Sequence, residues 1–289
     1  MIDAHVKTIQ QALSSRSNGI FTKTDLKDIV IQNLPEIGIK QETIIRRQIL
    51  EYLSEKGKLK EVIFKFPSRK ETRYVLGNVS EFQLAQSLKP NAYLAHRAAM
   101  FINGLCDERP DTIYINVEQS QHHKRNTNTL SQGTIDQAFK NKVRVSNEIA
   151  EANGVKVCIT HGQRTDQLGV ETIKRSTGEL LVITNLERTL IDIAVRPIYA
   201  GGPKEVLKAY THARSISLKK LAKILKELNY VYPYHQAVGF YLQNSGAFEI
   251  ADLKPFTSLK SDFDFYLDYR MKDPTYSPEW KIYYPRDLI

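Results

Sequence analysis

Three segments near the start of the chain carry apolar residues at the spacing of an amphipathic helix. The first covers about residues 3–15, and its apolar stripe consists of Ile2, Val6, Ile9 and Leu13. The second begins after Thr22, which can cap the helix, with Asp25 at the capping-box position. The third covers about residues 40–56, and its buried face is expected to contain Ile45, Ile49, Tyr52 and Leu53.

An alternation of apolar and polar residues follows and is typical of a strand. Residues 59–66 place Val62, Phe64 and Phe66 on one face. A turn over residues 67–70 leads into a return strand over residues 72–76. Because three helices followed by a two-stranded ribbon are typical of a winged helix, the sequence predicts a winged helix-turn-helix domain over residues 1–78.

The third helix and the ribbon tip carry the cationic and polar residues with which such a domain contacts DNA. Five residues of the helix are expected to approach the major groove: Lys40, Gln41, Thr43, Arg46 and Arg47. Arg69 and Lys70, at the ribbon tip, are expected at the phosphate backbone or in the minor groove. Residues 1–78 hold 14 Lys and Arg against 9 Asp and Glu, a net charge of +5 out of +9 for the whole chain. This concentration favours DNA binding over the alternative, a small helical domain with a solvated basic face.

Residues 79–289 are predicted to form a mixed α/β domain, with a possible sub-boundary near residue 230, so the fold class of the chain is α+β. A connecting helix over residues 81–88 precedes a clearer one over residues 91–103, on which His96 and Arg97 lie away from the core. A strand over residues 112–117 comes next. The polar stretch that follows is interpreted as a solvated loop or hairpin tip, with contact to a phosphate backbone as the alternative, and contains His122, His123, Lys124 and Arg125.

The rest of this domain is predicted to contain further strands and then helices. The strands cover residues 155–160, 169–175 and 179–184, and the last two form a hairpin. After a helix that begins at Thr184, more helices cover residues 203–213, 218–228 and 235–244. The helix over 218–228 has an outer face made of Lys219, Lys220, Lys223 and Lys226. We interpret this face as solvated, and contact with DNA, RNA or protein is the alternative. The tail is expected to form two strands, 263–269 and 280–284, whose aromatic residues fill a core or an interface.

A charged motif marks the helix that begins at Thr184. Thr184 and Glu187 have the spacing of a capping box, and Arg188 and Asp192 have the four-residue spacing of a helical ion pair. Their charges invite a catalytic interpretation. We instead predict a structural role for all four residues, because both patterns stabilise a helix by themselves.

The composition is that of a globular protein with a basic bias. Hydrophobic residues make up 42% and charged residues 25%, and the sequence pI of about 9.3 favours a polyanionic partner. Cys106 and Cys158 lack metal-ligand or redox spacing and are expected to be reduced and packed. No apolar run has membrane-spanning length and the start does not resemble a signal peptide, so we expect a cytoplasmic protein without membrane contact.

The strongest pattern for an enzyme is Glu279-Trp280-Lys281, preceded by Asp262 and Asp264. Metal-dependent nucleases of the restriction type use carboxylates to hold Mg²⁺ and a lysine to assist the attacking water. This pattern is expected by chance in a chain so rich in charge, and the sequence contains no zinc-ligand spacing, phosphate loop or serine-hydrolase motif. We therefore expect a protein that is not an enzyme and has no metal or cofactor. A Mg²⁺-dependent nuclease targeted by the winged helix is the alternative.

Two further motifs follow the predicted winged helix. One is Tyr-Leu-Ala-His-Arg-Ala-Ala-Met at residues 93–100, followed by Asn103-Gly104-Leu105, and the other is Glu-Arg-Thr-Leu-Ile-Asp at residues 187–192. Together with the winged helix they resemble the AbiEi-type antitoxin family of bacterial abortive-infection systems. The resemblance covers about residues 1–215, and the chain departs from the family pattern after about residue 230.

The resemblance implies a winged-helix transcriptional autorepressor that binds its own promoter as double-stranded DNA. It also implies an antitoxin, part of a toxin–antitoxin system in phage defence, that counters a nucleotidyltransferase-like toxin through its C-terminal domain. In typical members no stable complex forms, so the expected partners include the toxin or its RNA substrate. The chain itself is expected to be a monomer or a dimer.

Overall fold

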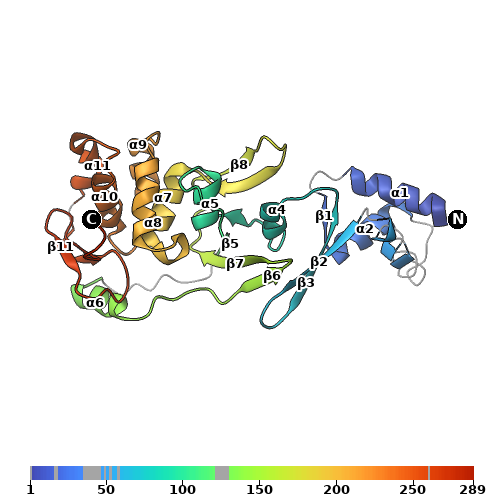
Figure 1. Cartoon of the computed structure of the whole chain (residues 1–289), viewed down its shortest axis with the longest axis horizontal. Helices are drawn as coiled ribbons and strands as arrows, with labels where there is room; N and C mark the ends of the chain where they lie inside the picture. Colours follow the sequence, from blue (N-terminus) through green and yellow to red (C-terminus); the bar gives the residue numbers. More distant parts are fainter. Residues whose placement is uncertain are drawn as a thin grey trace.

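The computed structural model describes residues 2–15, 19–34, 47–48, 50–51, 54–56, 59–120, 130–259 and 261–289, with side chains from residue 7 onward. This part of the chain has an α+β fold that is extended along one axis (Figure 1). The N-terminal helices lie at one end, and the C-terminal helices with a small sheet lie at the other. A large mixed sheet connects the two ends.

The N-terminal unit begins with two helices separated by a short strand. Its elements are α1 Ile2–Ser14, β1 Ile20–Phe21, α2 Lys23–Asn33, β2 Leu59–Lys65 and β3 Lys70–Leu76. The predicted capping box is confirmed, since the Thr22 hydroxyl accepts a hydrogen bond from the Asp25 N–H (3.1 Å) and the Asp25 carboxylate accepts one from the Thr22 N–H (2.7 Å). Where the predicted third helix is described, the chain is helical at residues 47, 48, 50, 51, 54 and 55 and forms a turn at residue 56.

The β2–β3 ribbon packs against a different hydrophobic core on each face. Leu59 belongs to the N-terminal core with Phe21 and Leu26, and Tyr74 and Leu76 pack against the same core. The opposite face belongs to a central core and consists of Val62, Phe64, Phe66 and Val75. Burial contributes about 1.5–3 kcal/mol for each large apolar side chain. The ribbon is therefore attached firmly to both parts of the molecule.

Within the described residues, nine strands form one sheet in the order β1-β3-β2-β6-β7-β5-β4-β9-β8. The strands beyond the ribbon are β4 Tyr93–Leu94, β5 Thr112–Glu118, β6 Ile149–Ala152, β7 Val155–Gly162, β8 Val170–Lys174 and β9 Leu180–Thr184. β5 pairs in parallel with β7, and β4 with β9. β2 meets β6 where Lys65 lies opposite Glu151. The sheet and the central core thus continue across the boundary predicted between residues 78 and 79.

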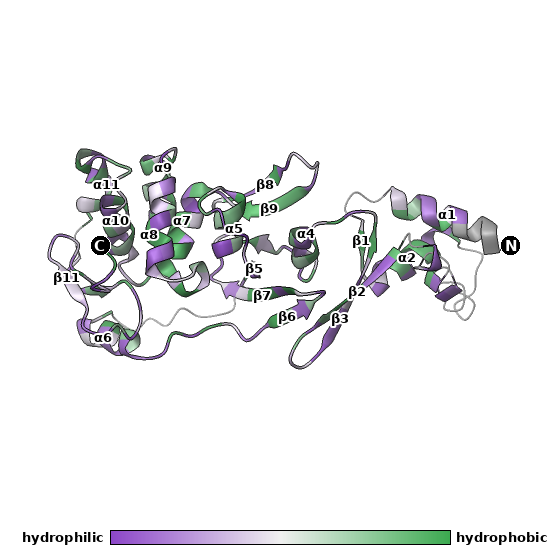
Figure 2. Cartoon of the chain, in the orientation of Figure 1, coloured by the Kyte–Doolittle hydropathy of each residue, from purple (hydrophilic) through white to green (hydrophobic). Residues whose placement is uncertain are grey.

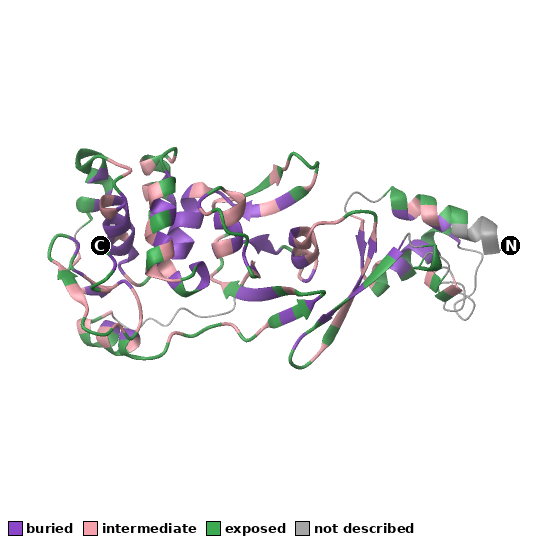
Figure 3. Ribbon diagram, in the orientation of Figure 1, coloured by how far each residue is buried: buried purple, intermediate pink, exposed green. Residues whose placement is uncertain are grey.

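Helices cover the sheet and form the C-terminal end of the molecule. They are α4 Glu81–Gln86, α5 His96–Ile102, α6 Gln132–Lys140, α7 Leu186–Val195, α8 Pro203–His212, α9 Leu218–Leu228, α10 Tyr234–Asn244 and α11 Lys254–Thr257, with 3₁₀ turns η1 Pro197–Ala200 and η2 Ile250–Leu253. α7 and α10 are largely buried (Figure 3), whereas α8 shows alternating hydrophobic and hydrophilic bands (Figure 2). Across the described ranges, no helix combines the length and the apolar character needed to cross a bilayer.

The predicted helix over residues 91–103 is wrong in its first half. Tyr93 and Leu94 form β4, which pairs with β5 and β9, and α5 begins only at His96. His96 itself lies in the core, with 6% of its surface exposed, and not on the helix surface as predicted. A short run that is apolar throughout does not distinguish a buried strand from a buried helix, which explains the error.

The C-terminal tail also differs from the prediction. It forms three short strands, β10 Phe265–Tyr266, β11 Thr275–Ser277 and β12 Ile282–Tyr284, where two longer ones were expected. Its aromatic residues were predicted to fill a core or an interface. Phe265 and Trp280 are buried in the C-terminal core, whereas Tyr276 is exposed. Nε2 of Gln236 in α10 lies within hydrogen-bond distance of the carbonyls of Phe263, Trp280 and Lys281, between which its two N–H bonds are shared, and this contact holds the tail. The sequence analysis did not predict α6 or β6.

Gly239 is the position in α10 at which the tail packs most closely. A Cβ at this position would overlap the six-membered ring of Trp280. Although alanine favours a helix more than glycine does, we expect Gly239→Ala to lower the free energy of unfolding by about 1–3 kcal/mol through overpacking. Gly133→Ala in α6 is the matched control, because nothing lies within 4 Å of its added Cβ. Gly133→Ala is expected to leave the free energy of unfolding unchanged or to raise it by up to about 1 kcal/mol. Equal effects of the two substitutions in denaturant unfolding would contradict this packing.

Candidate ligand cleft and nucleic-acid interface

The helix predicted to contact DNA is described only in part. Lys40, Gln41, Thr43 and Arg46 lie outside the described residues. The side chain of Arg47 is 72% exposed, and its Nε lies 3.7 Å from the carboxylate of Glu51, one helical turn further on. An exposed pair of this kind contributes little to stability. Arg47 can therefore exchange Glu51 for a phosphate or a base edge at little energetic cost.

Arg69 at the ribbon tip is held by an aromatic ring and two carboxylates. Its guanidinium carbon lies 3.9 Å from the centre of the Phe66 ring. Its Nε donates to Glu71 (2.9 Å) and its Nη1 to Glu148 (3.3 Å), which lies just before β6. Glu148 also hydrogen-bonds Nε2 of His161 at 3.1 Å. A DNA contact by Arg69 would have to replace these bonds.

Two lysines of the ribbon are more accessible than Arg69. Lys70, the second predicted contact at the tip, is exposed and lies opposite the exposed Lys65. Residues directly opposite each other in an antiparallel pair have side chains on the same face. This end of the ribbon therefore presents two neighbouring ammonium groups.

The capping box predicted at the start of α7 is wrong by one residue. The cap is Asn185, whose side chain accepts a hydrogen bond from the Arg188 N–H (2.9 Å). Thr184 is instead the last residue of β9, and its hydroxyl lies 2.8 Å from that of Thr189. Glu187 reaches α9, where its carboxylate accepts from Nζ of Lys220 at 2.8 Å. Although burial opposes its charge, this hydrogen bond keeps the pKa of Glu187 below its usual value.

The predicted ion pair between Arg188 and Asp192 is present and buried. Nε of Arg188 lies 2.7 Å from Oδ1 of Asp192, and the two side chains are 5% and 9% exposed. Nη1 of Arg188 also donates to the carbonyl of Leu168. Burial lowers the pKa of Arg188, but the Asp192 carboxylate more than offsets this and raises it above its usual value. Gly169 makes room for the pair, since a Cβ there would lie 2.7 Å from Cβ of Arg188.

A polar network extends from this pair to the central strands, beginning with Nη1 of Arg188, which donates to the Thr165 hydroxyl (3.4 Å). Nδ2 of Asn116 on β5 donates to the Tyr93 hydroxyl (2.8 Å), and the Thr160 hydroxyl on β7 donates to Oδ1 of Asn116 (2.9 Å). Glu118, at the end of β5, accepts from the Thr165 N–H at 2.9 Å. The network fixes the carboxyl ends of the two parallel strands relative to each other.

A cleft of about 660 Å³ opens beside this network. Its wall includes Asn116 from β5, Thr160 and His161 from β7, and Arg188 and Asp192 from α7. The wall also includes His96, residues 144–148, Arg196, and several tyrosines and a valine: Tyr199, Tyr230, Val231, Tyr232, Tyr234 and Tyr269. Ligands commonly bind beyond the carboxyl ends of parallel strands, and this volume is in the range of small-molecule sites.

His96 lies in this wall in an unusual state. Its φ is +52°, and its Nδ1 has no hydrogen-bond partner among the residues that the structure describes. Its ring packs against that of Tyr199, with 5.0 Å between the centroids. Burial lowers the pKa of His96 to about 4, with Asp192 opposing this shift and Arg196 adding to it. The imidazole is therefore neutral at pH 7, and one of its nitrogens is unused.

Two arginines bring uncompensated positive charge to the cleft. In the described part of the chain, neither Arg144 nor Arg196 forms an ion pair or a side-chain hydrogen bond. The two acidic residues of the wall are already paired, Glu148 with Arg69 and Asp192 with Arg188. The cleft is consequently suited to an anion.

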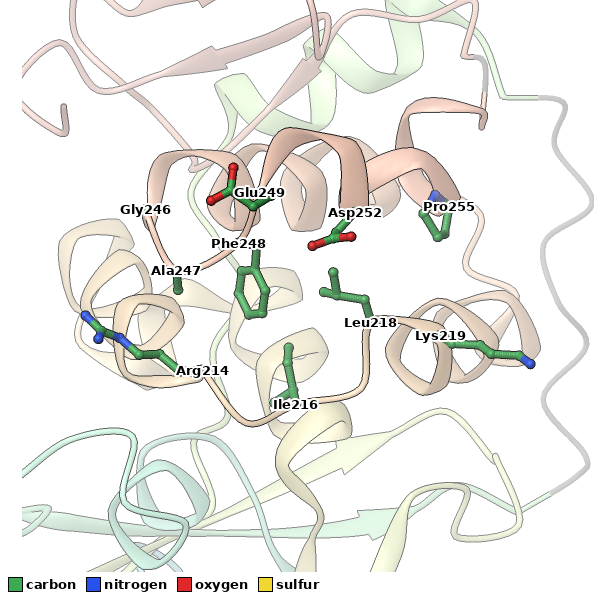
Figure 4. A pocket seen from close by; sticks show the side chains of 10 residues that line it. All are labelled: Arg214, Ile216, Leu218, Lys219, Gly246, Ala247, Phe248, Glu249, Asp252 and Pro255. Carbon is green, nitrogen blue, oxygen red and sulfur yellow. The ribbon is translucent and has the colours of Figure 1, made fainter.

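A second hollow, of about 590 Å³, lies between the start of α9 and the turn before η2. Phe248, Ile216 and Leu218 converge in it, whereas Arg214 and Lys219 extend away from it (Figure 4). On the lysine face of α9, Lys220 pairs with Glu187, and Nζ of Lys223 lies 3.9 Å from Glu227. Such pairing with acidic neighbours agrees with a solvated surface.

A third hollow, of about 280 Å³, contains residues of the Glu-x-Lys pattern: Asp262, Glu279 and Lys281. The Glu279 carboxylate accepts a hydrogen bond from Gln243 (2.7 Å), and Nζ of Lys281 donates to the Ser261 carbonyl (3.1 Å). Over the described ranges, no group of three or more His, Cys, Asp or Glu side chains is arranged to hold a metal ion.

The sequence analysis did not find the cleft. Arg144 and Arg196 belong to no local motif, and His96 was assigned to a helix surface. A usable signal was the segment Tyr-Val-Tyr-Pro-Tyr at residues 230–234, which concentrates aromatic rings beside a proline. Only the fold brings this segment to the ends of β5 and β7.

No family model and no curated protein match the chain. Among solved structures, its fold is similar to a crystal structure of the RV2827C protein from Mycobacterium tuberculosis, with a TM-score of 0.56 and 16% sequence identity. The similarity covers 97% of this chain and 91% of that one. At this identity it concerns the fold alone, which the two proteins share over nearly their whole lengths.

We expect the buried pair in α7 to be essential for stability. Arg188→Met keeps part of the aliphatic stem but leaves the Asp192 carboxylate buried without its partner. This substitution should lower the free energy of unfolding by about 3–5 kcal/mol. The matched control is Lys223→Met, which removes one partner of the exposed pair with Glu227 in α9 and should cost less than about 1 kcal/mol. Denaturant unfolding measures both variants. If Arg188→Met left stability unchanged but abolished a biological activity, the structural role of the motif would be wrong.

The pKa of His96 predicts a loss of stability in mild acid. As the pH falls from about 6.5 to about 4, the unfolded chain binds a proton at this residue and the folded chain does not, so His96 should lower stability by up to about 3 kcal/mol. His96→Asn removes the titrating group, and asparagine tolerates the positive φ. The difference in unfolding free energy between the two proteins should therefore change between pH 7 and pH 4. A difference that is independent of pH would show that His96 is not buried as a neutral imidazole.

Proposed function

We propose that the chain is a DNA-binding transcriptional regulator whose residues 1–78 act as a winged helix on double-stranded DNA upstream of its own gene. One observation carries this proposal: β1, between α1 and α2, pairs with the return strand β3 of the ribbon. A short strand that closes a helical unit onto a two-stranded ribbon is the arrangement expected of a winged helix. The described helical residues, which are 47, 48, 50, 51, 54 and 55, precede the ribbon, as a recognition helix would.

The charges of this unit support DNA as its ligand. Arg47 is exposed and weakly paired, and Lys65 and Lys70 lie side by side on the ribbon. The net charge of +5 in residues 1–78 adds a sequence-independent attraction to phosphates. Lys40, Gln41, Thr43 and Arg46 complete the proposed major-groove surface, and Lys70 is preferred over Arg69 as the contact of the ribbon tip.

We further propose that residues 79–289 act as an antitoxin against a nucleotidyltransferase-like toxin, by contact with the toxin or with its RNA substrate. A bare repressor needs only a DNA-binding unit and a dimerisation element. This part of the chain instead has a hydrophobic core of its own at the C-terminal end and a cleft lined by arginines and tyrosines. Its size and the motifs that resemble the AbiEi-type family support a second task.

A Mg²⁺-dependent nuclease is the second proposed function, and a single observation favours it. Asp262, Glu279 and Lys281 line the same hollow. Incubating duplex DNA from the upstream region with the protein, with and without Mg²⁺, separates the two proposals. Metal-dependent cleavage that is lost in Glu279→Gln supports the nuclease, whereas binding without cleavage supports the regulator.

Replacing Arg46 and Arg47 together by alanine should weaken binding to the upstream duplex at least tenfold. Each arginine that reads a base is worth about 1–3 kcal/mol. The matched control is the double variant Arg214→Ala, Arg286→Ala, which removes the same charge from exposed positions in the C-terminal part of the chain. A gel-shift titration of folded variants measures the effect. Unchanged affinity in the Arg46, Arg47 variant, or an equal loss in the control, would contradict the assigned surface.

The antitoxin role should survive the loss of DNA binding. Co-expression of the neighbouring toxin gene with the Arg46→Ala, Arg47→Ala chain should restore growth as well as the wild-type chain does. The full-length chain is used because removing residues 1–78 would take the ribbon out of the central core. Failure of both chains to restore growth would leave a transcriptional regulator without an antitoxin function.

A further inference from the structure

The cleft between β5, β7 and α7 has the charge of an anion-binding site. Arg144 and Arg196 both line it, and within the described residues neither guanidinium is neutralised by a carboxylate. Glu148 and Asp192 are both committed to other arginines. A planar guanidinium matches the oxygens of a phosphate group and donates two parallel hydrogen bonds to it.

Aromatic side chains lie on the same wall as these arginines. Tyr230, Tyr232 and Tyr269 are half-buried and line the cleft together with Tyr199 and Tyr234. Tyr232 is supported from behind by an edge-to-face contact with Phe139, with 6.0 Å between the ring centroids. Partly exposed tyrosines beside arginines are the side chains on which nucleobases stack in nucleotide-binding proteins.

His96 supplies a second, independent indication of a ligand. Its imidazole is 6% exposed, lines the cleft and has an Nδ1 atom without a partner among the described residues. A buried polar atom without a hydrogen bond is costly, so a water, an ion or a ligand is expected to complete its bonding. The φ of His96 is also positive, a strained backbone conformation for a residue other than glycine. Such strain is concentrated at binding and active sites.

We propose that this cleft binds a phosphorylated nucleotide, with Arg144 and Arg196 on the phosphate, Tyr230 and Tyr232 against the base and His96 as a hydrogen-bonding group. The ligand is either a free nucleotide or the terminal nucleotide of an RNA strand, since both present the same phosphate and base. The site belongs to residues 96–269 and includes no residue of the N-terminal unit. It therefore does not depend on the proposed DNA binding.

The test is calorimetric titration of the full-length protein with two probes, ATP and a single-stranded RNA of ten nucleotides. At least one probe should bind, and Arg144→Ala and Arg196→Ala should each weaken its binding about tenfold or more. Arg144 is exposed, so its replacement should leave the fold intact. Arg214→Ala is the matched control, because Arg214 is an exposed arginine on the same part of the chain but outside the cleft. It should bind like wild type.

The outcomes of the titration identify the class of ligand or overturn the proposal. Binding of ATP alone assigns the site to free nucleotides, and binding of the RNA alone assigns it to an RNA end. A several-fold loss with His96→Asn, in a variant that unfolds at the wild-type temperature, supports a direct contact by the imidazole. Absence of binding by both probes, or equal losses with Arg144→Ala and Arg214→Ala, would overturn the proposal.

Discussion

The β2–β3 ribbon buries one face in the N-terminal core and the other in the central core, and the rest of the arrangement depends on this double packing. Since side chains alternate between the two faces of a strand, one seven-residue strand can serve both cores at once. Arg69 strengthens the connection, because it ties the ribbon tip to Glu148 at the entrance of β6. The ribbon therefore links the proposed DNA-binding unit physically to the larger part of the chain.

The same contact brings the ribbon close to the cleft. Glu148 bonds both Arg69 and His161, and Glu148 and His161 line the cleft. The Glu148 carboxylate thus connects the ribbon tip directly to the wall of the cleft. The buried Arg188–Asp192 pair has a different role. Arg188 and Asp192 neutralise each other within α7, so that the remaining positive charge of the cleft comes from Arg144 and Arg196.

Local patterns predicted those elements that local interactions determine. The capping box of Thr22 and Asp25, the alternation of Val62, Phe64 and Phe66, and the four-residue spacing of Arg188 and Asp192 each involve neighbours in sequence, and all three are present. Tyr93 and Leu94 were misassigned because their strand is defined by partners on β5 and β9, which lie far away in the sequence. The cleft was missed for the same reason. His96, Arg144, Arg196 and Tyr230 become neighbours only after the sheet has formed.

The most direct test of the central claim is the affinity of the full-length chain for DNA from upstream of its own gene. It should be compared with a scrambled duplex of the same length at two salt concentrations. We predict tighter binding to the upstream duplex, and weaker binding to both duplexes at the higher salt concentration, because phosphate contacts release counterions. Equal affinity for the two duplexes, or binding that does not change with salt, would contradict a regulator that reads its own promoter.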